Sequence, residues 1–217
     1  MEVNIVKHLH AWKPQRTSLE KVIRMIKTSQ VLKDYTDVAR LLYAAGKKEQ
    51  GDSIKKNQIP AFSPAAYMLD GLGRENLIGL TGLCFIDIDK IGEDQVESAM
   101  AILQEDEHVL FAARSISGKG LHILVPYTLW REDPETSTKT TPNRRNQTYV
   151  SVFKSVAERY RNILGLPVDK NAGHAEHLCL ASYDANAWYN PGAKPITYRY
   201  VHQRATKYPK KFEEYIP

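Results

Sequence analysis

The first third of the chain carries apolar residues at the spacing of helices. An amphipathic helix is predicted to run to about residue 32, from apolar side chains on one face: Leu19, Val22, Ile23 and Ile26. Thr17, with Glu20 three residues later, gives this helix a capping-box start. A second helix is predicted from near Thr36 to Gly46, because glycine is the usual residue just past a helix end. We expect both helices to be scaffold.

Polar stretches flank these helices, and strands follow them. Residues 1–16 read as an exposed lead-in with room for one short strand, and residues 47–64 read as a polar loop. From Leu77 onward the pattern predicts a strand, a helix, a hairpin, a long helix and a short strand, at residues 83–89, 93–105, 109–125, 149–164 and 178–182. Residues 131–143 read as an insertion. This order predicts an α+β fold, with a small, mainly antiparallel sheet backed by helices.

The strand at residues 83–89 ends in two acidic residues. Successive side chains of a strand point to opposite faces, so Asp87 and Asp89 share one face while Ile86 and Ile88 share the other. Two ionised carboxylates this close repel each other unless a proton or a cation lies between them. Oxygen ligands of this kind suit Mg²⁺ or Mn²⁺. The alternative is that Asp87 is a solvated strand-end residue and Asp89 starts a turn.

The turn of the predicted hairpin is rich in glycine. Gly118 and Gly120 would let backbone N–H groups approach a phosphate, and Lys119 adds a positive charge. It is not a P-loop, because Lys119 is followed by glycine rather than by Ser or Thr. Ser117 precedes these residues and His122 follows them. Read alone, the segment also fits a tight turn with a buried core histidine.

Composition narrows the class of protein only a little. The chain has 217 residues and a formal net charge of +5, a mild indication of a polyanionic partner. No apolar run is long enough to span a bilayer, so we expect no membrane partner. Cys84 and Cys179 both lie in apolar runs and are expected to be reduced core residues of a cytoplasmic protein.

A third acidic residue completes a candidate catalytic set. Asp169 follows the long predicted helix and precedes the last strand-like run. If Asp87, Asp89 and Asp169 converge beside Lys119 and His122, they form a metal-dependent nucleotidyl-transfer site.

These stretches together resemble the archaeo-eukaryotic primase, or primase-polymerase, superfamily. Residues 85–89 resemble its first motif, residues 117–122 its second, and Asp169 stands where its third places a carboxylate. The chain further resembles the branch of N-terminal domains that precede VirE-type helicase regions in bacterial mobile elements. The segments that carry this likeness are Lys56 to Ala61, Ser182-Tyr183-Asp184-Ala185 and Asn190-Pro191, so the resemblance covers roughly residues 50–195.

The resemblance implies an RRM-like catalytic core at residues 77–200, a helical extension at 1–76 and a basic tail at 201–217. It also implies a primase-like enzyme that adds NTP or dNTP on single-stranded DNA in mobile-element or plasmid replication. Asp87, Asp89 and Asp169 would hold two Mg²⁺ or Mn²⁺ ions. The triphosphate would bind to Ser117, Gly118, Lys119, Gly120 and His122, and a helicase domain or subunit would be the partner.

One departure from the family pattern keeps alternatives open. Members usually carry an arginine shortly before the Ser-Tyr-Asp segment, where this chain has His177. The main alternative is therefore a catalytically degenerate domain that binds single-stranded nucleic acid or a helicase. A nuclease is a second alternative, although its paired histidines could only be His8 and His10, outside the expected core. A zinc site at His174, His177 and Cys179 would lack a fourth ligand and the usual spacing.

Overall fold

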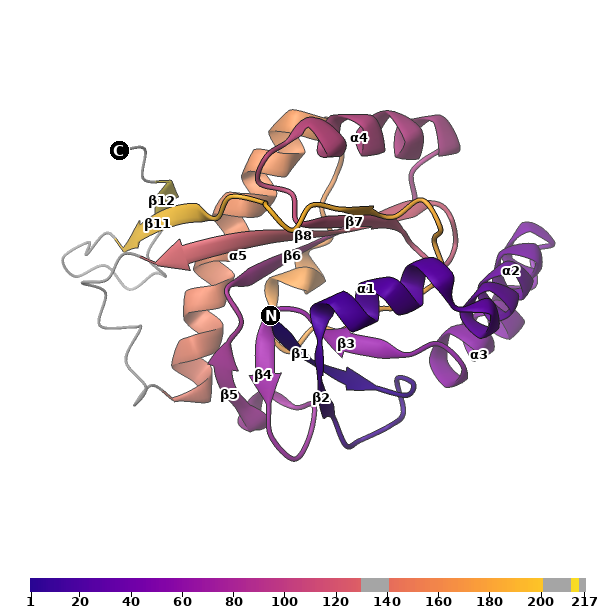
Figure 1. Cartoon of the computed structure of the whole chain (residues 1–217), viewed down its shortest axis with the longest axis horizontal. Helices are drawn as coiled ribbons and strands as arrows, with labels where there is room; N and C mark the ends of the chain where they lie inside the picture. Colours follow the sequence, from indigo (N-terminus) through magenta and orange to yellow (C-terminus); the bar gives the residue numbers. More distant parts are fainter. Residues whose placement is uncertain (130–140, 201–211, 215–217) are drawn as a thin grey trace.

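The computed structural model, drawn in Figure 1, describes residues 1–129, 141–200 and 212–214 and has an α+β fold. The described residues contain five α-helices, namely α1 (Leu19–Thr28), α2 (Gln30–Ala44), α3 (Lys48–Asn57), α4 (Glu93–Glu105) and α5 (Pro142–Leu164). Two short 3₁₀ helices, η1 (Arg74–Asn76) and η3 (Lys170–Gly173), accompany them. No helix among the described residues combines the length and the apolar character that crossing a membrane requires.

The larger sheet is built around one long strand, β8 (Gly120–Leu129), which pairs with three others. Its strand order is β10-β7-β8-β11-β12, and β6 also pairs with β8. The remaining strands are β6 (Leu83–Asp89), β7 (Phe111–Arg114), β10 (Trp188–Tyr189), β11 (Ile196–Tyr200) and β12 (Phe212–Glu214). All of these pairings are antiparallel except that of β11 with β8. The expected strand, helix and hairpin at residues 83–125 are therefore confirmed.

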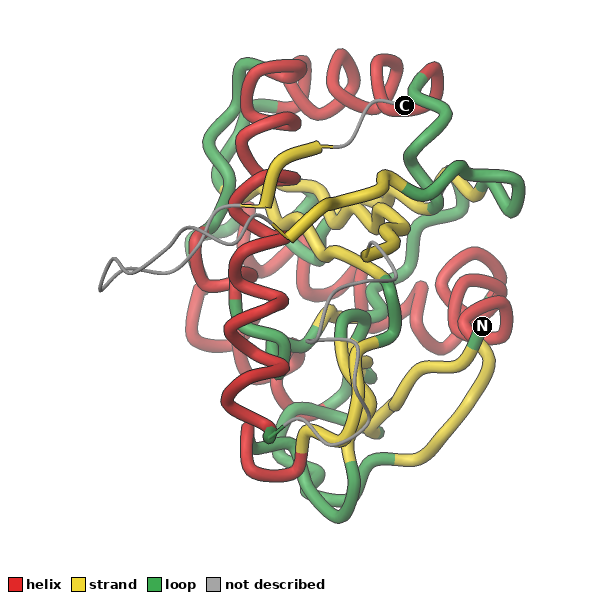
Figure 2. The backbone as a smooth tube through the Cα atoms, turned by 90° about the vertical axis from the view of Figure 1, so that its left-hand side faces the viewer, coloured by secondary structure: helices red, strands yellow, loops and turns green. Residues whose placement is uncertain are grey.

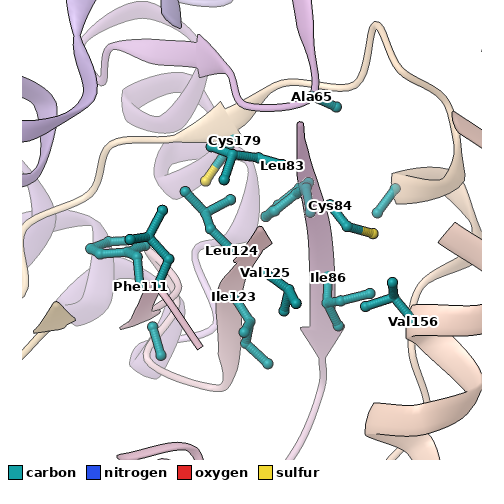
Figure 3. Packing of buried hydrophobic residues seen from close by; sticks show 14 of the residues in the cluster. Ala65, Leu83, Cys84, Ile86, Phe111, Ile123, Leu124, Val125, Val156 and Cys179 are labelled. Atoms are coloured by element: carbon teal, nitrogen blue, oxygen red, sulfur yellow. The ribbon is translucent and has the colours of Figure 1, made fainter. Parts of the chain in front are cut away.

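The two faces of β6 have different surroundings. Ile86 points toward Val156 of α5, and both side chains are fully buried (Figure 3). On the opposite face, the Phe85 ring stacks on His177 with 5.9 Å between ring centroids. Asp87 and Asp89 share the Phe85 face by alternation. The strand is thus held by an apolar core on one side and offers its acidic residues on the other.

A smaller sheet, in the order β2-β1-β3-β9, corrects the prediction of an exposed lead-in. Its strands are β1 (Glu2–Val6), β2 (Gln15–Ser18), β3 (Ala61–Ser63) and β9 (Cys179–Leu180), and a separate pair is formed by β4 (Ala66–Met68) and β5 (Leu77–Leu80). Val3 and Val6 are buried in the core. Because β3 pairs with β9, this sheet joins the range 1–76 to the range 77–200. The division at residue 76 itself stays a prediction.

The long helix α5 packs against both the β4–β5 pair and the larger sheet. It packs on β5 and β6 and contacts both 3₁₀ helices, and it runs along the side of the molecule that faces the viewer in Figure 2. Its end matches the prediction, since Gly165 closes it with a left-handed φ of 65°.

The N-terminal helices differ in their bounds from the prediction. The break between α1 and α2 falls at Ser29, whose backbone N–H donates to Met25 while its side chain accepts from Leu32. Ser18, rather than Thr17, caps α1 by accepting a hydrogen bond from the Lys21 amide. Thr36 is not a helix start but a buried residue within α2.

The expected loop at residues 47–64 is also wrong, because it contains α3 and β3. Residues 130–140 of the expected insertion, and most of the basic tail at 201–217, lie outside the described residues. Thr141 caps α5, and Pro142 begins it, so the end of the expected insertion is helical.

Candidate metal centre

A cleft of about 1310 Å³ lies where β6 and β8 meet beside helices α2 and α3. Most of its lining comes from the end of β6 with the loop that follows, the turn before β8, helices α2 and α3, and the segment before β9. Asp87, Asp89, Ser117, Lys119 and His122 are all part of this lining. The structure thus brings residues from two of the sequence motifs to one cavity.

The three aspartates converge, although only Asp87 and Asp89 line the cleft and Asp169 is not part of its lining. One carboxylate oxygen from each of Asp87, Asp89 and Asp169 lies within 4.8 Å of the others, and no other group of three or more metal-binding side chains occurs among the described residues. Asp169 reaches the strand because its backbone N–H donates to the carbonyl of Asp87 at 2.8 Å. Oxygen donors gathered from two segments are a ligand set that suits a hard divalent cation.

Asp87 is the least solvated member of the set. It is 9% exposed, and its Oδ1 is buried with no hydrogen-bond partner in the described chain. Burial, reinforced by the charges of Asp89 and Asp169, raises the pKa of Asp87 to about 7. A buried carboxylate oxygen without a donor is costly unless a cation or proton lies against it. The site therefore fits a metal ion.

His122 does not supply a positive charge that would neutralise Asp87. It stands opposite Asp87 in the pairing of β6 with β8, with 3.7 Å between His122 Nε2 and Asp87 Oδ1. This distance is too long for a hydrogen bond. Burial lowers the pKa of His122 to about 4, so the ring is neutral at pH 7 and the contact is not an ion pair.

Asp169 has a structural task beside its place in the acidic cluster. It caps η3, accepting the Asn171 amide on Oδ1 at 3.0 Å. The buried Tyr149 hydroxyl then ties η3 to β6, because it accepts from the Phe85 N–H at 3.2 Å and donates to the Ala172 carbonyl at 3.1 Å. The spacing of the three acids is thus fixed from inside the core.

The glycine-rich turn is shaped by its close approach to β6. A side chain at Gly120 would place its Cβ 2.3 Å from the Ile88 carbonyl oxygen, and Gly118 has a left-handed φ of 74°. The Lys119 carbonyl accepts a hydrogen bond from Ile91, which fastens the turn to the loop after β6. Both glycines therefore have backbone reasons to be there, and their role toward a phosphate stays a prediction.

The cationic wall of the cleft was not predicted from the sequence. Arg40, Lys48 and Lys55 line it from α2 and α3, the helices expected to be scaffold or loop. Arg40 donates to the carbonyls of Ser115, Ile116 and Tyr183, and so braces the turn against the segment after β9. Lys55 lines the cleft, whereas Lys56, the residue singled out in the sequence, is exposed and outside the lining.

The remaining histidines and Cys179 do not form a second metal site among the described residues. His177 lines the cleft, and burial lowers its pKa, so it is neutral at pH 7. Burial raises the pKa of Cys179 well above that of a free thiol, and its Sγ lies 3.5 Å from His122 Nδ1. His8 and His10 follow β1 and are not part of the cleft lining.

Comparison with known proteins assigns a family but no function. The model of the family described as "BT4734-like, N-terminal domain" matches residues 54–189, which is more than half of the chain and includes all three aspartates. No curated protein matches the chain. No solved structure matches it either.

Proposed function

This chain belongs to the family of BT4734-like N-terminal domains, and we propose that it is a metal-dependent nucleotidyltransferase of the primase-polymerase kind. Its reaction would add NTP or dNTP on a single-stranded DNA template in mobile-element or plasmid replication. The observation that carries the proposal is the gathering of Asp87, Asp89 and Asp169, the first two of which line a large cleft. One buried carboxylate oxygen of this cluster has no hydrogen-bond partner among the described residues.

The acidic cluster is the part of the site that would hold Mg²⁺ or Mn²⁺. When bound, such ions neutralise charge on the phosphates and stabilise both the attacking and the leaving oxygens of nucleotidyl transfer. Asp89, at the exposed end of β6, and Asp169, which caps η3, would hold the cation from two segments. Asp87 would contribute the least solvated carboxylate of the three.

The glycine-rich turn is the part that would receive the triphosphate. Lys119 brings a positive charge to the same cleft as the acids, and Ser117 Oγ accepts the Lys119 amide at 3.2 Å, which orders the turn. Neutral His122 offers a hydrogen bond rather than a charge. Positioning together with electrostatic stabilisation is most of what phosphoryl-transfer chemistry asks of a protein.

The direct test is extension of a labelled primer on single-stranded DNA with Mg²⁺ or Mn²⁺ and either class of triphosphate. We expect Asp89→Ala to abolish extension without loss of folding, because this side chain is exposed. The matched control is Asp94→Ala, an exposed acid in the first turn of α4 that should extend like the parent protein. Full extension by Asp89→Ala would show that the active site lies elsewhere.

A second function, binding without catalysis, is favoured by one observation. His177 stands where the primase-like branch carries an arginine, and its partly buried ring is neutral at pH 7. A site that lacks this charge stabilises a transferring phosphate less well. Binding of single-stranded DNA that persists in EDTA, with no extension under any metal, would favour this second function.

A further inference from the structure

Helices α2 and α3 give a cationic wall, formed by Arg40, Lys48 and Lys55, to the cleft that Asp87 and Asp89 also line. We propose that Lys55 of this wall binds the terminal phosphates of the metal-bound nucleoside triphosphate, so that the N-terminal helices are part of the nucleotide site. The inference rests on the proposed function and extends it to helices that were expected from the sequence to be scaffold or loop.

Lys55 is the member of the wall whose charge is available to a ligand. Lys48, Asp52 and Lys55 recur at helical spacing on the face of α3 that lines the cleft. Lys48 forms an ion pair with Asp52, whose other oxygen accepts the Tyr43 hydroxyl at 3.0 Å. The Lys55 ammonium group forms no hydrogen bond or ion pair within the described part of the chain, although the residue is only partly exposed.

Lys55 lines the same cleft as Asp87 and Asp89 of the candidate metal centre. Its positive charge favours the ionised form of the Asp87 carboxyl. A lysine ammonium beside a metal-binding cluster repels a metal ion that binds without an anion. The two positive groups become compatible when an anion lies between them, and a triphosphate carrying a divalent ion is such a ligand.

The position of Lys55 is set by tight packing of α3 on α2. Gly51 is buried one turn before Lys55, and a Cβ there would lie 2.7 Å from Cε1 of Tyr43. The absence of a side chain lets the backbone of α3 approach the Tyr43 ring. The hydrogen bond between Tyr43 and Asp52 then fixes the face of α3 that meets the cleft. This packing and this hydrogen bond thus hold α3 in place, although the short polar sequence of α3 by itself favours a helix only weakly.

Titration calorimetry with Mn²⁺ alone, and with inorganic triphosphate in the presence of Mn²⁺, tests the proposal on the full chain. Inorganic triphosphate isolates the phosphate contact from the base and sugar. We expect Lys55→Ala to weaken binding of the Mn²⁺-triphosphate about tenfold or more, the usual effect of losing one charge-assisted hydrogen bond. The same variant should bind Mn²⁺ alone as well as the parent or better, because a repelling charge has been removed.

Two controls separate a phosphate contact from damage to the fold. Lys56→Ala removes a neighbouring exposed charge outside the cleft and should leave both affinities unchanged. Lys55→Arg keeps the charge and should retain most of the triphosphate affinity. Parent-like triphosphate binding by Lys55→Ala, or equal loss of Mn²⁺ and triphosphate binding, would overturn the inference while leaving the proposed function in place. If the parent itself binds no Mn²⁺-triphosphate, both fail together.

Discussion

Asp87 should make the metal-free protein less stable as the pH rises, and replacing it with asparagine should remove this cost. In the folded chain the pKa of Asp87 is raised to about 7, chiefly by burial, whereas an unfolded aspartate titrates near its ordinary value of about 4. At a pH below the pKa of Asp87 in the unfolded chain, the carboxyl is protonated in both the folded and the unfolded state, and it does not lower the free energy of unfolding. Above the folded pKa both states are ionised, and the folded state carries the full cost of the buried charge.

The size of the effect follows from the difference between the two pKa values. A shift of about three units corresponds to about 4 kcal/mol at most, and roughly 3 kcal/mol of it develops between pH 5 and pH 8. The free energy of unfolding of Asp87→Asn should therefore rise relative to the parent by this amount over that range. The substituted amide would still meet the unpartnered environment of Oδ1, but it carries no charge to desolvate.

Urea denaturation in EDTA at pH 5, 6, 7 and 8 measures this difference. Asp94→Asn, on the exposed first turn of α4, is the matched control and should follow the parent at every pH. Adding Mn²⁺ at pH 8 should stabilise the parent and not Asp87→Asn, because the cation binds the ionised carboxylate. A difference between Asp87→Asn and parent that stays constant from pH 5 to pH 8 would refute the reasoning.

Two further predictions concern the framework of the site. Tyr149→Phe removes the hydroxyl that ties β6 to η3, so it should lower the free energy of unfolding by about 1–3 kcal/mol in urea denaturation and weaken Mn²⁺ binding. Tyr160→Phe removes a buried hydroxyl that donates to Asp106, and it should destabilise the fold without changing the affinity for Mn²⁺. Equal Mn²⁺ affinities for the two variants would contradict the proposed coupling. Gly120→Ala should be strongly destabilised and lose Mn²⁺ binding, because its Cβ would collide with the backbone of β6. The Cβ of Gly118→Ala meets only the Arg40 side chain, at 3.7 Å, so this variant should lose about 1 kcal/mol of unfolding free energy through backbone strain. Similar unfolding curves for the two glycine variants would contradict this account.

The elements that surround the acidic strand were predictable because their patterns are local. In α4 the apolar residues recur at helical spacing, and its bounds, Glu93–Glu105, match the prediction. Residues 86–89, at the end of β6, alternate between apolar and acidic side chains, and the pairing of this strand with β8 places Asp87 opposite His122. Each pattern contains enough information to indicate both the type of element and the face that it buries.

The burial of the first strand was missed because a polar residue interrupts its apolar pattern. Asn4 is buried in β1, where its side chain exchanges two hydrogen bonds with the backbone of Met68, 64 residues away. A buried amide is stable only when such partners exist, and these partners come from the tertiary fold. The same residue in isolation reads as part of an exposed segment.

The cationic wall could not be predicted for a similar reason. Helix α3 has no continuous apolar face and contains Gly51, which disfavours a helix in the absence of packing. What holds α3 is its contact with Tyr43 of α2, so its existence depends on another helix. Arg40 and Lys55 line the same cleft as Asp87 and Asp89 because of how these helices pack, and no local sequence pattern predicts that placement.

Titration of Mn²⁺ into the protein, with and without a nucleoside triphosphate, tests the central claim most directly. The comparison is between the parent and the double variant Asp87→Ala/Asp89→Ala, with Asp94→Ala as the control for loss of an exposed acid. The account predicts that the parent and the control bind the triphosphate in a metal-dependent manner and that the double variant, although folded, does not. Equal binding by the double variant, or no metal-dependent binding by the parent, would contradict it.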